Sequence, residues 1–336
     1  MKNLFNNIKN YVKQYYKVII VYILLLAFFL VEFPYYISAP GGLIDTDDKV
    51  KTTENFHMSG SLNMAYVSEI HATIPTLVIS LFNKDWDVEK EEEVKNDNET
   101  VEEKNYRNKM LLEEANDTAL LVAYKHSNIK YNITNNKVYI TYIDELADTN
   151  LKIGDQILEI DNQKIKNKTE LFAVIASKNI GDEIKMKVKD IDGNNKTRKA
   201  TLIDVSGSPK VGAVVTETFD VNSNKKIKFN FKQSESGSSG GLMLTLTLYS
   251  HLNEIDLTDG KTIVGTGTID AEGNVGEISG VKYKLIGAVK KGADVFIVPK
   301  GENYEEAKKV KKEKGYDIKL VPVATFEEAL EYLENM

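Results

Sequence analysis

The longest apolar run in the chain lies close to its start, where Val18–Val31 contains no charged residue. This run alone is short for a bilayer crossing. Its flanks extend it, because Lys17 and Glu32 can reach the headgroups and four tyrosines suit the aromatic belts of a membrane interface. These tyrosines are Tyr15, Tyr16, Tyr35 and Tyr36. The pattern predicts a transmembrane helix over residues 15–37, preceded by a short tail at residues 1–14.

The charges on the two sides of this run predict its orientation. Four lysines and no acid precede it, whereas acids follow it. Under the positive-inside rule the N-terminus is cytoplasmic, and the chain after about residue 38 lies outside the cell. A cleaved signal peptide is the alternative, since Ser38-Ala39 offers small residues, but Ile37 stands where the cleavage pattern needs another. A buried core helix would not carry basic residues on one side only. We therefore favour an uncleaved, single-pass anchor in the cell membrane.

Residues 38–105 have a mixed pattern and are expected to lie next to the membrane. Short apolar stretches such as Thr76–Phe82 contain β-branched side chains and predict strands. Residues 85–104 are mostly Glu, Asp, Lys and Asn. That composition indicates a solvated helix or a mobile insert, of unknown role, rather than a core element.

The next segment, residues 106–205, predicts a small β-rich domain. It opens with apolar residues at helical spacing between Met110 and Tyr124. Thr169 is placed to cap a short helix further along. Alternating positions predict strands at residues 137–143, 156–160 and 183–188.

Residues 206–336 alternate predicted strands with predicted helices, as α/β domains do. Thr325 is placed to cap the last helix. Apolar runs predict strands at residues 211–215, 227–231, 262–269, 294–299 and 318–323. The fold class expected for the chain is α/β (α+β), with an N-terminal transmembrane helix, a small β-rich domain and a C-terminal α/β domain.

Composition and charge exclude several classes of function. The net charge is −7 and no basic stripe occurs, so a nucleic-acid partner is not expected. The chain has no cysteine, which excludes disulfides, thiolate catalysis and cysteine zinc sites. The four histidines lack the spacing of metal ligands. They are His57, His71, His126 and His251. No metal and no cofactor are therefore expected.

One loop in the C-terminal segment has the composition of a catalytic loop. Residues 234–241 are serine, glycine and one glutamate, and an apolar helix follows at once. A helix start presents free backbone N–H groups, so a serine there lies beside donors for an oxyanion. A flexible linker is one alternative. A phosphate-binding loop is another, because residues 259–262 match the end of a P-loop, but its first glycine would fall at Ile255.

The β-rich segment resembles a PDZ domain. The run LKIGDQILEIDNQKI, followed by ELFAVI and GDEIKMKV, is similar to the central signature of that family over about seventy residues. PDZ domains bind extended peptides by adding a strand to a sheet edge. A Gly-Leu-Gly-Phe carboxylate loop is not evident, so binding of a free C-terminus is left open, as is a role as a spacer.

The C-terminal segment resembles the catalytic domain of the Lon peptidases. GSSGGLMLTL is similar to the Gly-Pro-Ser-Ala-Gly serine box with its apolar helix, and GTGTIDAEGNVGEISGVKYK to the Thr-Gly and Lys-x-Lys boxes. The resemblance implies that Ser239 is the nucleophile and Lys284 the general base. It gives Thr266 a supporting role, together with Ser238 and Gly240, which flank the serine.

The chain departs from the Lon pattern at several positions. Ser238 and Gly240 stand where the family has Pro and Ala, and Ser236 replaces an acidic residue. The pair before the lysines is Ser279-Gly280 rather than Gly-Gly. The neighbouring serines are alternative nucleophiles, and Lys282 is the alternative base.

Together these features resemble the membrane-anchored PDZ/Lon-like serine peptidases of Gram-positive bacteria. The resemblance implies an endopeptidase that cleaves peptides or proteins, possible substrates being secreted signalling peptides, on the extracellular side. No ATPase region fits beside these segments, so the activity should not need ATP. Lon-like domains often form rings, which allows a homo-oligomer. The alternative is a catalytically silent, membrane-tethered peptide-binding module with the same fold.

Overall fold

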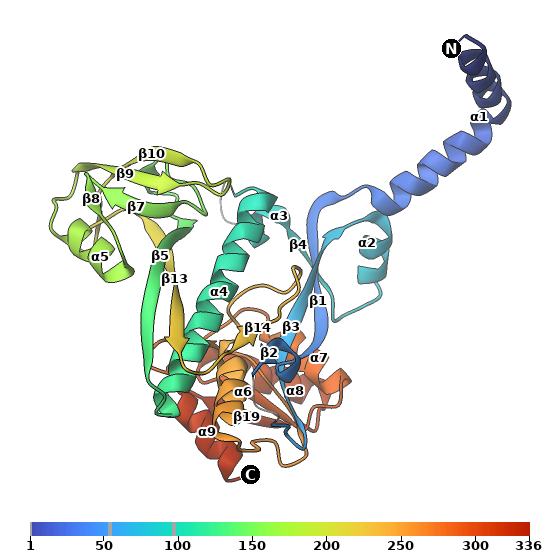
Figure 1. Ribbon diagram of the computed structural model, residues 1–336. Coiled ribbons are helices and arrows are strands. Elements are labelled where there is room, and N and C mark those ends of the chain that lie inside the picture. Colours follow the sequence, from blue (N-terminus) through green and yellow to red (C-terminus); the bar gives the residue numbers. More distant parts are fainter. Residues whose placement is uncertain (1, 53–55, 96–98) are drawn as a thin grey trace. The chain divides into compact units, whose positions relative to one another are not determined.

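The computed structural model describes residues 2–52, 56–95 and 99–336 (Figure 1). The chain divides into two compact units. The first contains residues 1–40 and 67–94, and the second contains residues 41–66 and 95–336. The larger unit is therefore built from two stretches that are separated in the sequence.

The first unit begins with a long helix, α1 (Lys2–Leu30). Its stretch Lys9–Leu30 is long and apolar enough to cross a membrane, and none of it is buried within the protein. A signal sequence would have the same character. The helix ends before the predicted residue 37, because β1 (Phe33–Asp45) starts at Phe33. Pro34 accounts for this early end, since proline disfavours helical geometry at the residue before it.

The remainder of the first unit includes two short helices and a pair of antiparallel strands. The helix α2 (Ile74–Ser80) occupies most of Thr76–Phe82, so the predicted strand there is wrong. A capping box starts this helix, because the Thr73 N–H donates to Thr76 Oγ1 at 2.8 Å, and Pro75 occupies its first turn. After α2, β4 (Asp87–Lys90) pairs antiparallel with β1, and α3 (Glu91–Val94) follows.

A parallel sheet forms the centre of the second unit. The first part of β3 (Ser61–Ala72) pairs with β15 (Thr262–Gly265), which pairs with β18 (Val295–Pro299) and then β19 (Lys319–Val323). Alternate residues of β15 and β18 enter two different apolar clusters. One face of the sheet therefore packs on α4 (Val101–His126), α6 (Gly241–Asn253) and α9 (Phe326–Glu334). The other face packs on α7 (Val281–Lys290) and α8 (Glu302–Lys314).

This core uses segments that are far apart in the sequence. Two residues of β3, Leu62 and Met64, lie in the same apolar cluster as α6. This cluster also contains five residues of α4: Ala119, Leu120, Val122, Ala123 and Tyr124. The helix predicted between residues 110 and 124 is therefore present, but its apolar side packs on α6 and not only on the β-rich domain. Periodicity shows that a helix needs an apolar partner and does not show which one.

Short elements complete the second unit. A 3₁₀ helix, η1 (Asp47–Lys49), leads into β2 (Val50–Lys51), which pairs with β14 (Lys228–Phe229). A small hairpin of β16 (Thr268–Ile269) and β17 (Val275–Gly276) follows β15. Thr325 caps α9 as predicted, since its side chain accepts the Glu328 N–H.

The β-rich domain has its own core. Its sheet has the order β13-β5-β7-β9-β10-β6, and α5 (Lys168–Ala176) packs on one face. The strands are β5 (Tyr131–Ile143), β6 (Asp148–Thr149), β7 (Gln156–Ile160), β9 (Glu183–Lys189), β10 (Asn195–Thr201) and β13 (Ala213–Ser223). Three shorter strands complete the domain. β8 (Gln163–Lys164) pairs with β7, and β11 (Ile203–Val205) pairs with β12 (Ser208–Lys210).

These elements confirm the strands predicted at residues 137–143, 156–160 and 183–188, and the mixed α/β class. The single strand predicted over residues 262–269 is wrong, because the chain there is divided between β15 and β16, which belong to different sheets. A further local detail differs from the sequence-based expectation. Asn167, not Thr169, caps α5, because its side chain accepts the Glu170 N–H at 2.8 Å. Both residue types suit an N-cap, and the helix simply begins two residues earlier.

Candidate active site

The serine-rich loop leads directly into α6, as the sequence predicts. Gly240 is the N-cap of α6, and Gly241 N donates to Ser238 O at 3.2 Å. Gly240 also packs closely on β3, since a Cβ atom there would lie 2.6 Å from Met64 Sδ. This contact gives a physical reason for glycine where the family pattern has alanine. Ser239 thus directly precedes the N-cap of a buried helix.

Thr266 connects this loop to the sheet. It follows β15, is fully buried, and its N–H donates to Ile297 O at 3.1 Å. Its hydroxyl donates to the carbonyl oxygen of Ser239 at 3.0 Å. The next residue reinforces the link, because Gly267 N donates to the same carbonyl at 2.8 Å. The Ser239 main chain is therefore held by two neighbouring donors.

Lys284 approaches the same threonine from the other side of the sheet. Its Nζ donates to Thr266 Oγ1 at 3.1 Å. The side chain is only 3% exposed, and burial lowers the pKa of Lys284 to about 7. Lys284 also lies in the first turn of α7, where the helix dipole disfavours a cation. Glycine at the N-cap, Gly280, allows the left-handed backbone (φ 74°) from which α7 starts.

The structure therefore brings Ser239, Thr266 and Lys284 together, with Ser238 and Gly240 framing the loop. Within the described part of the chain, the hydrogen bond of Lys284 Nζ goes to Thr266 rather than to the Ser239 hydroxyl. Lys282, the alternative base, projects elsewhere. Its Nζ lies 5.2 Å from the centre of the Tyr283 ring. The geometry thus favours Lys284 over Lys282 as the partner of the loop.

Two residues outside the serine-rich loop, Lys49 and Asn108, contact it and were not indicated by the sequence. Lys49 Nζ lies 2.9 Å from Glu235 Oε1, and the two side chains are 9% and 14% exposed. Nearby, Asn230 N donates to Lys49 O, and Gly237 N donates to Asn108 O on α4. The loop before Ser239 is therefore fastened to η1 and to α4. No local pattern links residues so far apart in the chain.

A His–Asp pair is present but lies at the wrong end of α6 for a catalytic triad. His251 Nε2 is hydrogen-bonded to Asp47 Oδ1. Ten residues separate Gly241 from His251, which corresponds to about 15 Å along a helix. His71 and His126 have other partners, Tyr36 and Glu327. These histidines are therefore not partners of Ser239.

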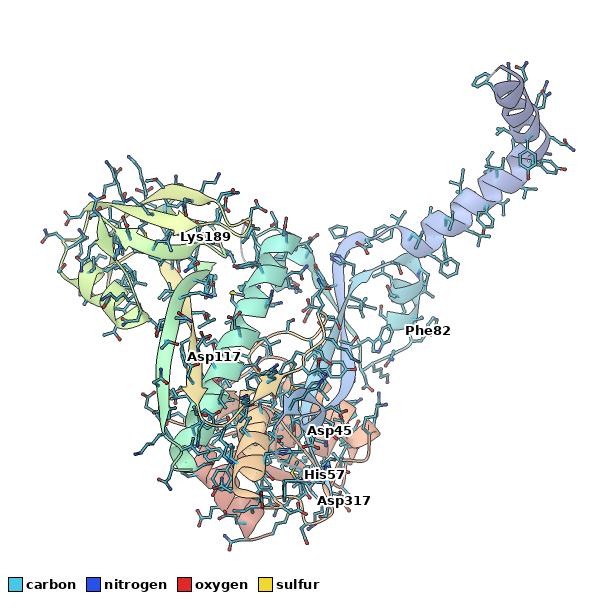
Figure 2. All side chains as sticks on the ribbon, viewed as in Figure 1. Asp45, His57, Phe82, Asp117, Lys189 and Asp317 are labelled. Carbon is cyan, nitrogen blue, oxygen red and sulfur yellow. The ribbon has the colours of Figure 1, made fainter. Side chains whose placement is uncertain are left out.

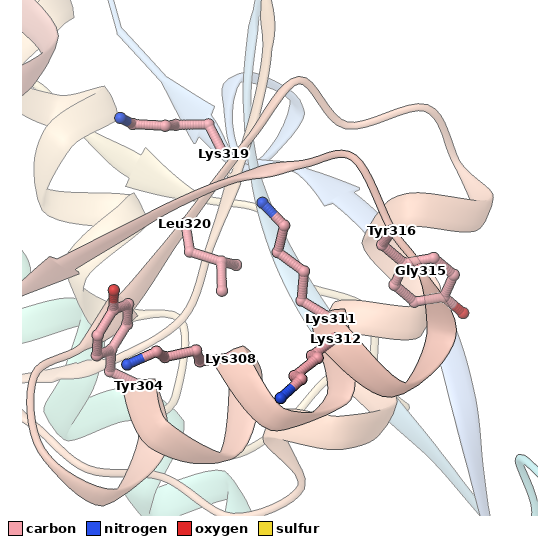
Figure 3. A pocket seen from close by; sticks show the side chains of 8 residues that line it. All are labelled: Tyr304, Lys308, Lys311, Lys312, Gly315, Tyr316, Lys319 and Leu320. Carbon is pink, nitrogen blue, oxygen red and sulfur yellow. The ribbon is translucent and has the colours of Figure 1, made fainter.

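Other hollows lie elsewhere on the second unit. Figure 3 shows one between α8 and β19, and its residues are Tyr304, Lys308, Lys311, Lys312, Gly315, Tyr316, Lys319 and Leu320. Lys311 Nζ there donates to Ile318 O at 2.7 Å. This hollow contains lysines but no serine nucleophile. Among the described residues, no group of three His, Asp or Glu side chains is arranged to hold a metal ion.

A second hollow is an apolar groove of about 210 Å³ in the β-rich domain. It lies between α5, with Phe172 and Ile175, and the segment that carries Pro209 and Val211. Its floor includes Ile140 and Met186. The groove has the apolar lining that an extended peptide requires for its side chains.

Comparison with protein families gives two matches. The model of the PDZ domain matches residues 128–189. The model of the Lon protease (S16) C-terminal proteolytic domain matches residues 230–335. The first match falls on the β-rich domain and the second on the Ser239 loop and the sheet that follows it.

Comparison with curated proteins gives Lon proteases. The chain is 27% identical to the Lon protease of Campylobacter jejuni over 190 residues, 54% of this chain and 22% of that protein. It is 32% identical to the Lon protease of Mycoplasmopsis agalactiae over 99 residues, 30% of this chain and 10% of that protein. The matched part of the chain thus spans about a fifth of the Campylobacter protein and a tenth of the Mycoplasmopsis protein.

Two solved structures of PDZ domains are similar to part of the chain. The PDZ domain of an SdrC-like protein from Listeria monocytogenes is 29% identical, with a TM-score of 0.23 over 25% of this chain and 92% of that one. The PDZ domain of an SdrC-like protein from Listeria innocua is 34% identical, with a TM-score of 0.21 over 24% of this chain and 92% of that one.

Proposed function

Because the chain carries a PDZ domain and the C-terminal proteolytic domain of the Lon proteases, we propose that it is a serine endopeptidase with Ser239 as nucleophile and Lys284 as general base. The observation that supports this most is the burial of Lys284, which lowers its pKa to about 7. A lysine must be neutral to accept a proton, and an ordinary lysine is not neutral at physiological pH.

The proposed reaction has two halves. Neutral Lys284 takes the proton of Ser239 Oγ as this oxygen attacks the peptide carbonyl carbon, and the resulting ammonium then protonates the leaving amine. In the second half Lys284 takes a proton from water as the water oxygen attacks the acyl-enzyme carbonyl. The ammonium then returns this proton to Ser239 Oγ as the ester C–O bond breaks, which releases the carboxylic acid product and restores both Ser239 and neutral Lys284. Backbone N–H groups at the start of α6, near Gly240, stabilise the oxyanion in both halves.

Thr266 has a positioning role in this scheme. Its proton is directed to the Ser239 carbonyl, so its oxygen is left to accept a hydrogen bond from Lys284. Thr266 therefore binds an N–H of neutral Lys284 and not its lone pair. The lone pair stays available for the Ser239 hydroxyl, which is the condition for a general base.

The other parts of the chain define where this peptidase acts. We infer that α1 anchors it as a single-pass protein of the cell membrane, with the N-terminus in the cytoplasm and the catalytic domain outside. The apolar groove of the PDZ domain would receive an extended segment of a peptide or protein substrate. The proposed activity needs neither ATP nor a metal.

The test is cleavage of unfolded proteins and peptides by the full chain in detergent or nanodiscs, with and without ATP. Ser239→Ala and Lys284→Arg should both be inactive, since arginine stays charged. Lys282→Ala is the matched control and should remain active. Full activity in Lys284→Arg, or loss of activity in Lys282→Ala alone, would contradict the assignment.

The PDZ groove also supports a second function, a membrane-tethered peptide-binding module without catalysis. A reactive serine probe separates the two. Labelling of the wild type but not of Ser239→Ala supports the peptidase. Peptide binding that requires Phe172, with no labelling of Ser239, supports the binding module.

A further inference from the structure

The turn after α2 carries an exposed apolar group in the first unit. Leu81 and Phe82 are 81% and 84% exposed, and Val78 and Ile79 are also exposed. Phe82 is labelled in Figure 2. No residue of α2 is buried, and residues 74–83 contain no charge. A water-facing helix does not need such a composition.

Hydrogen bonds give this turn a defined shape. Phe82 N donates to Ile79 O at 3.1 Å, which presents Leu81 and Phe82 at the end of α2. Trp86 N then donates to Asn83 O at 3.0 Å, and Asp85 N donates to Asn83 Oδ1 at 3.1 Å. The chain therefore turns back sharply, and the apolar tip formed by residues 78–82 is part of a folded element.

The tip lies beside the proposed membrane anchor. Helix α2 contacts α1, and Figure 1 shows it next to the end of α1 that leads into β1. That end is Leu30, the last residue of the apolar stretch. Lys9–Leu30 corresponds to about 33 Å of helix, close to the ~30 Å of a hydrocarbon core. The apolar tip is therefore near the level at which α1 leaves the bilayer.

We propose that α2 and the apolar tip form a second membrane contact, in which Leu81 and Phe82 enter the interfacial layer of the bilayer that α1 crosses. This inference depends on the proposed anchor. Trp86, half-buried and four residues beyond Phe82, suits the interface, where tryptophan is enriched. Lys84 is exposed beside it and suits the headgroup layer.

A bilayer fits this surface better than a second copy of the chain. A stable protein interface buries ~800 Å² of surface on each partner, and the four apolar side chains of this one turn can supply only a small part of that area. An interfacial segment needs only an apolar side and polar neighbours, because headgroups and water satisfy the latter.

Trp86 is the only tryptophan in the chain, so its fluorescence reports on this turn alone. The experiment reconstitutes the full chain into phosphatidylcholine vesicles whose acyl chains carry bromine, which quenches tryptophan on contact. Trp86 emission should decrease relative to unbrominated vesicles. The double variant Leu81→Ser/Phe82→Ser should lose most of this quenching. Leu146→Ser is the matched control, because Leu146 is 80% exposed in the second unit, and it should be quenched like the wild type.

Flotation of the same vesicles shows whether the chain is bound to the membrane at all. This measurement distinguishes a missing second contact from a missing membrane anchor. Chain that floats but shows no quenching would overturn the second contact and leave the anchor standing. Chain that does not float with the vesicles would overturn the anchor first. Quenching that is absent at a high protein-to-lipid ratio and appears only after dilution in lipid would assign the tip to self-association and overturn the proposal, because a second copy would shield Trp86 from the brominated chains.

Discussion

Lys49 and Glu235 form an ion pair of 2.9 Å although 186 positions separate them in the sequence. The pair joins η1 to the loop that carries Ser239, and both side chains are largely buried. Removing one partner leaves an uncompensated buried charge, which is costly. The loop would then lose one of its fixed points four residues before the proposed nucleophile.

We therefore predict that Glu235→Gln lowers kcat/KM by about 10- to 100-fold, because small misplacements of reacting groups have effects of this size. Lys49→Met should have a similar effect. The double variant should be less impaired than the two single effects combined, since neither charge is then left alone. Peptide cleavage measured for all four proteins gives this coupling. Strict additivity would show that the pair does not position the loop.

Thr266 provides the second prediction. Thr266→Val keeps the shape of the side chain but removes the hydroxyl that joins Lys284 to the Ser239 carbonyl. A buried group that loses its partner costs about 1–3 kcal/mol, so kcat/KM should fall roughly 5- to 150-fold. Thr266→Ser retains the hydroxyl and should keep most of the activity. Equal activity in the valine and serine variants would remove the positioning role of Thr266.

The sequence predicted local features well and tertiary partners poorly. The small-residue loop before an apolar helix lies in one continuous stretch, so its pattern predicts it. Thr266 and Lys284 were identified through the resemblance of their boxes to those of the Lon peptidases. The structure adds that the Thr266 hydroxyl is hydrogen-bonded both to Lys284 and to the main chain of Ser239. The neighbour of β15 is β3, about 200 residues earlier, and no local pattern selects one strand as the parallel partner of another.

The wrong prediction at Thr76–Phe82 has a local cause. Threonine, valine and isoleucine favour strands through their branched side chains. Here the capping box of Thr73 and Thr76, together with Pro75, starts a helix instead. Those helix signals were present in the sequence. The apolar character that suggested a buried strand belongs instead to the exposed tip, where burial in protein is not required.

Asp117 on α4 provides a prediction about stability. Its carboxylate accepts the Phe219 N–H of β13 at 2.9 Å. Burial, with further contributions from nearby carboxylates such as Glu113 and Asp220, raises the pKa of Asp117 to about 7. The folded state therefore binds more protons than the unfolded state between about pH 4 and pH 7. Stability contributed by this group falls as pH rises through that range.

Asp117→Asn should therefore increase the free energy of unfolding at pH 8 by an amount on the order of 2 kcal/mol, which raises the thermal midpoint. At pH 4 the substitution should have no such effect. Asp317→Asn is the control at an exposed site, and Figure 2 labels both positions. Thermal unfolding of the three proteins across pH 4–8 measures the difference. A gain that is the same at every pH would show that charge burial is not its cause.

Lys284 should show the opposite pH dependence, and it connects activity with stability. Its pKa is lowered from 10.5 to about 7 by burial, so the folded state binds fewer protons than the unfolded state between these values. The full cost of burying the charge is present below pH 7. Stability therefore rises with pH from about 7 to 10.5 and is then constant. Because the base must be neutral, kcat/KM should rise as pH passes 7 and level off above it.

Lys284→Met removes the charge and keeps an apolar chain of similar length. It should be inactive yet more stable than the wild type, by up to about 4 kcal/mol at pH 6, with the gain disappearing by about pH 10.5. Lys282→Met, which changes a less buried lysine on the same helix, should show neither effect. Thermal unfolding at pH 6 and pH 10, together with a pH profile of peptide cleavage, tests both predictions. Activity that begins to rise only near pH 10 would mean that Lys284 titrates like an ordinary lysine. Burial would then not lower its pKa, and Lys284 could not act as the general base at neutral pH.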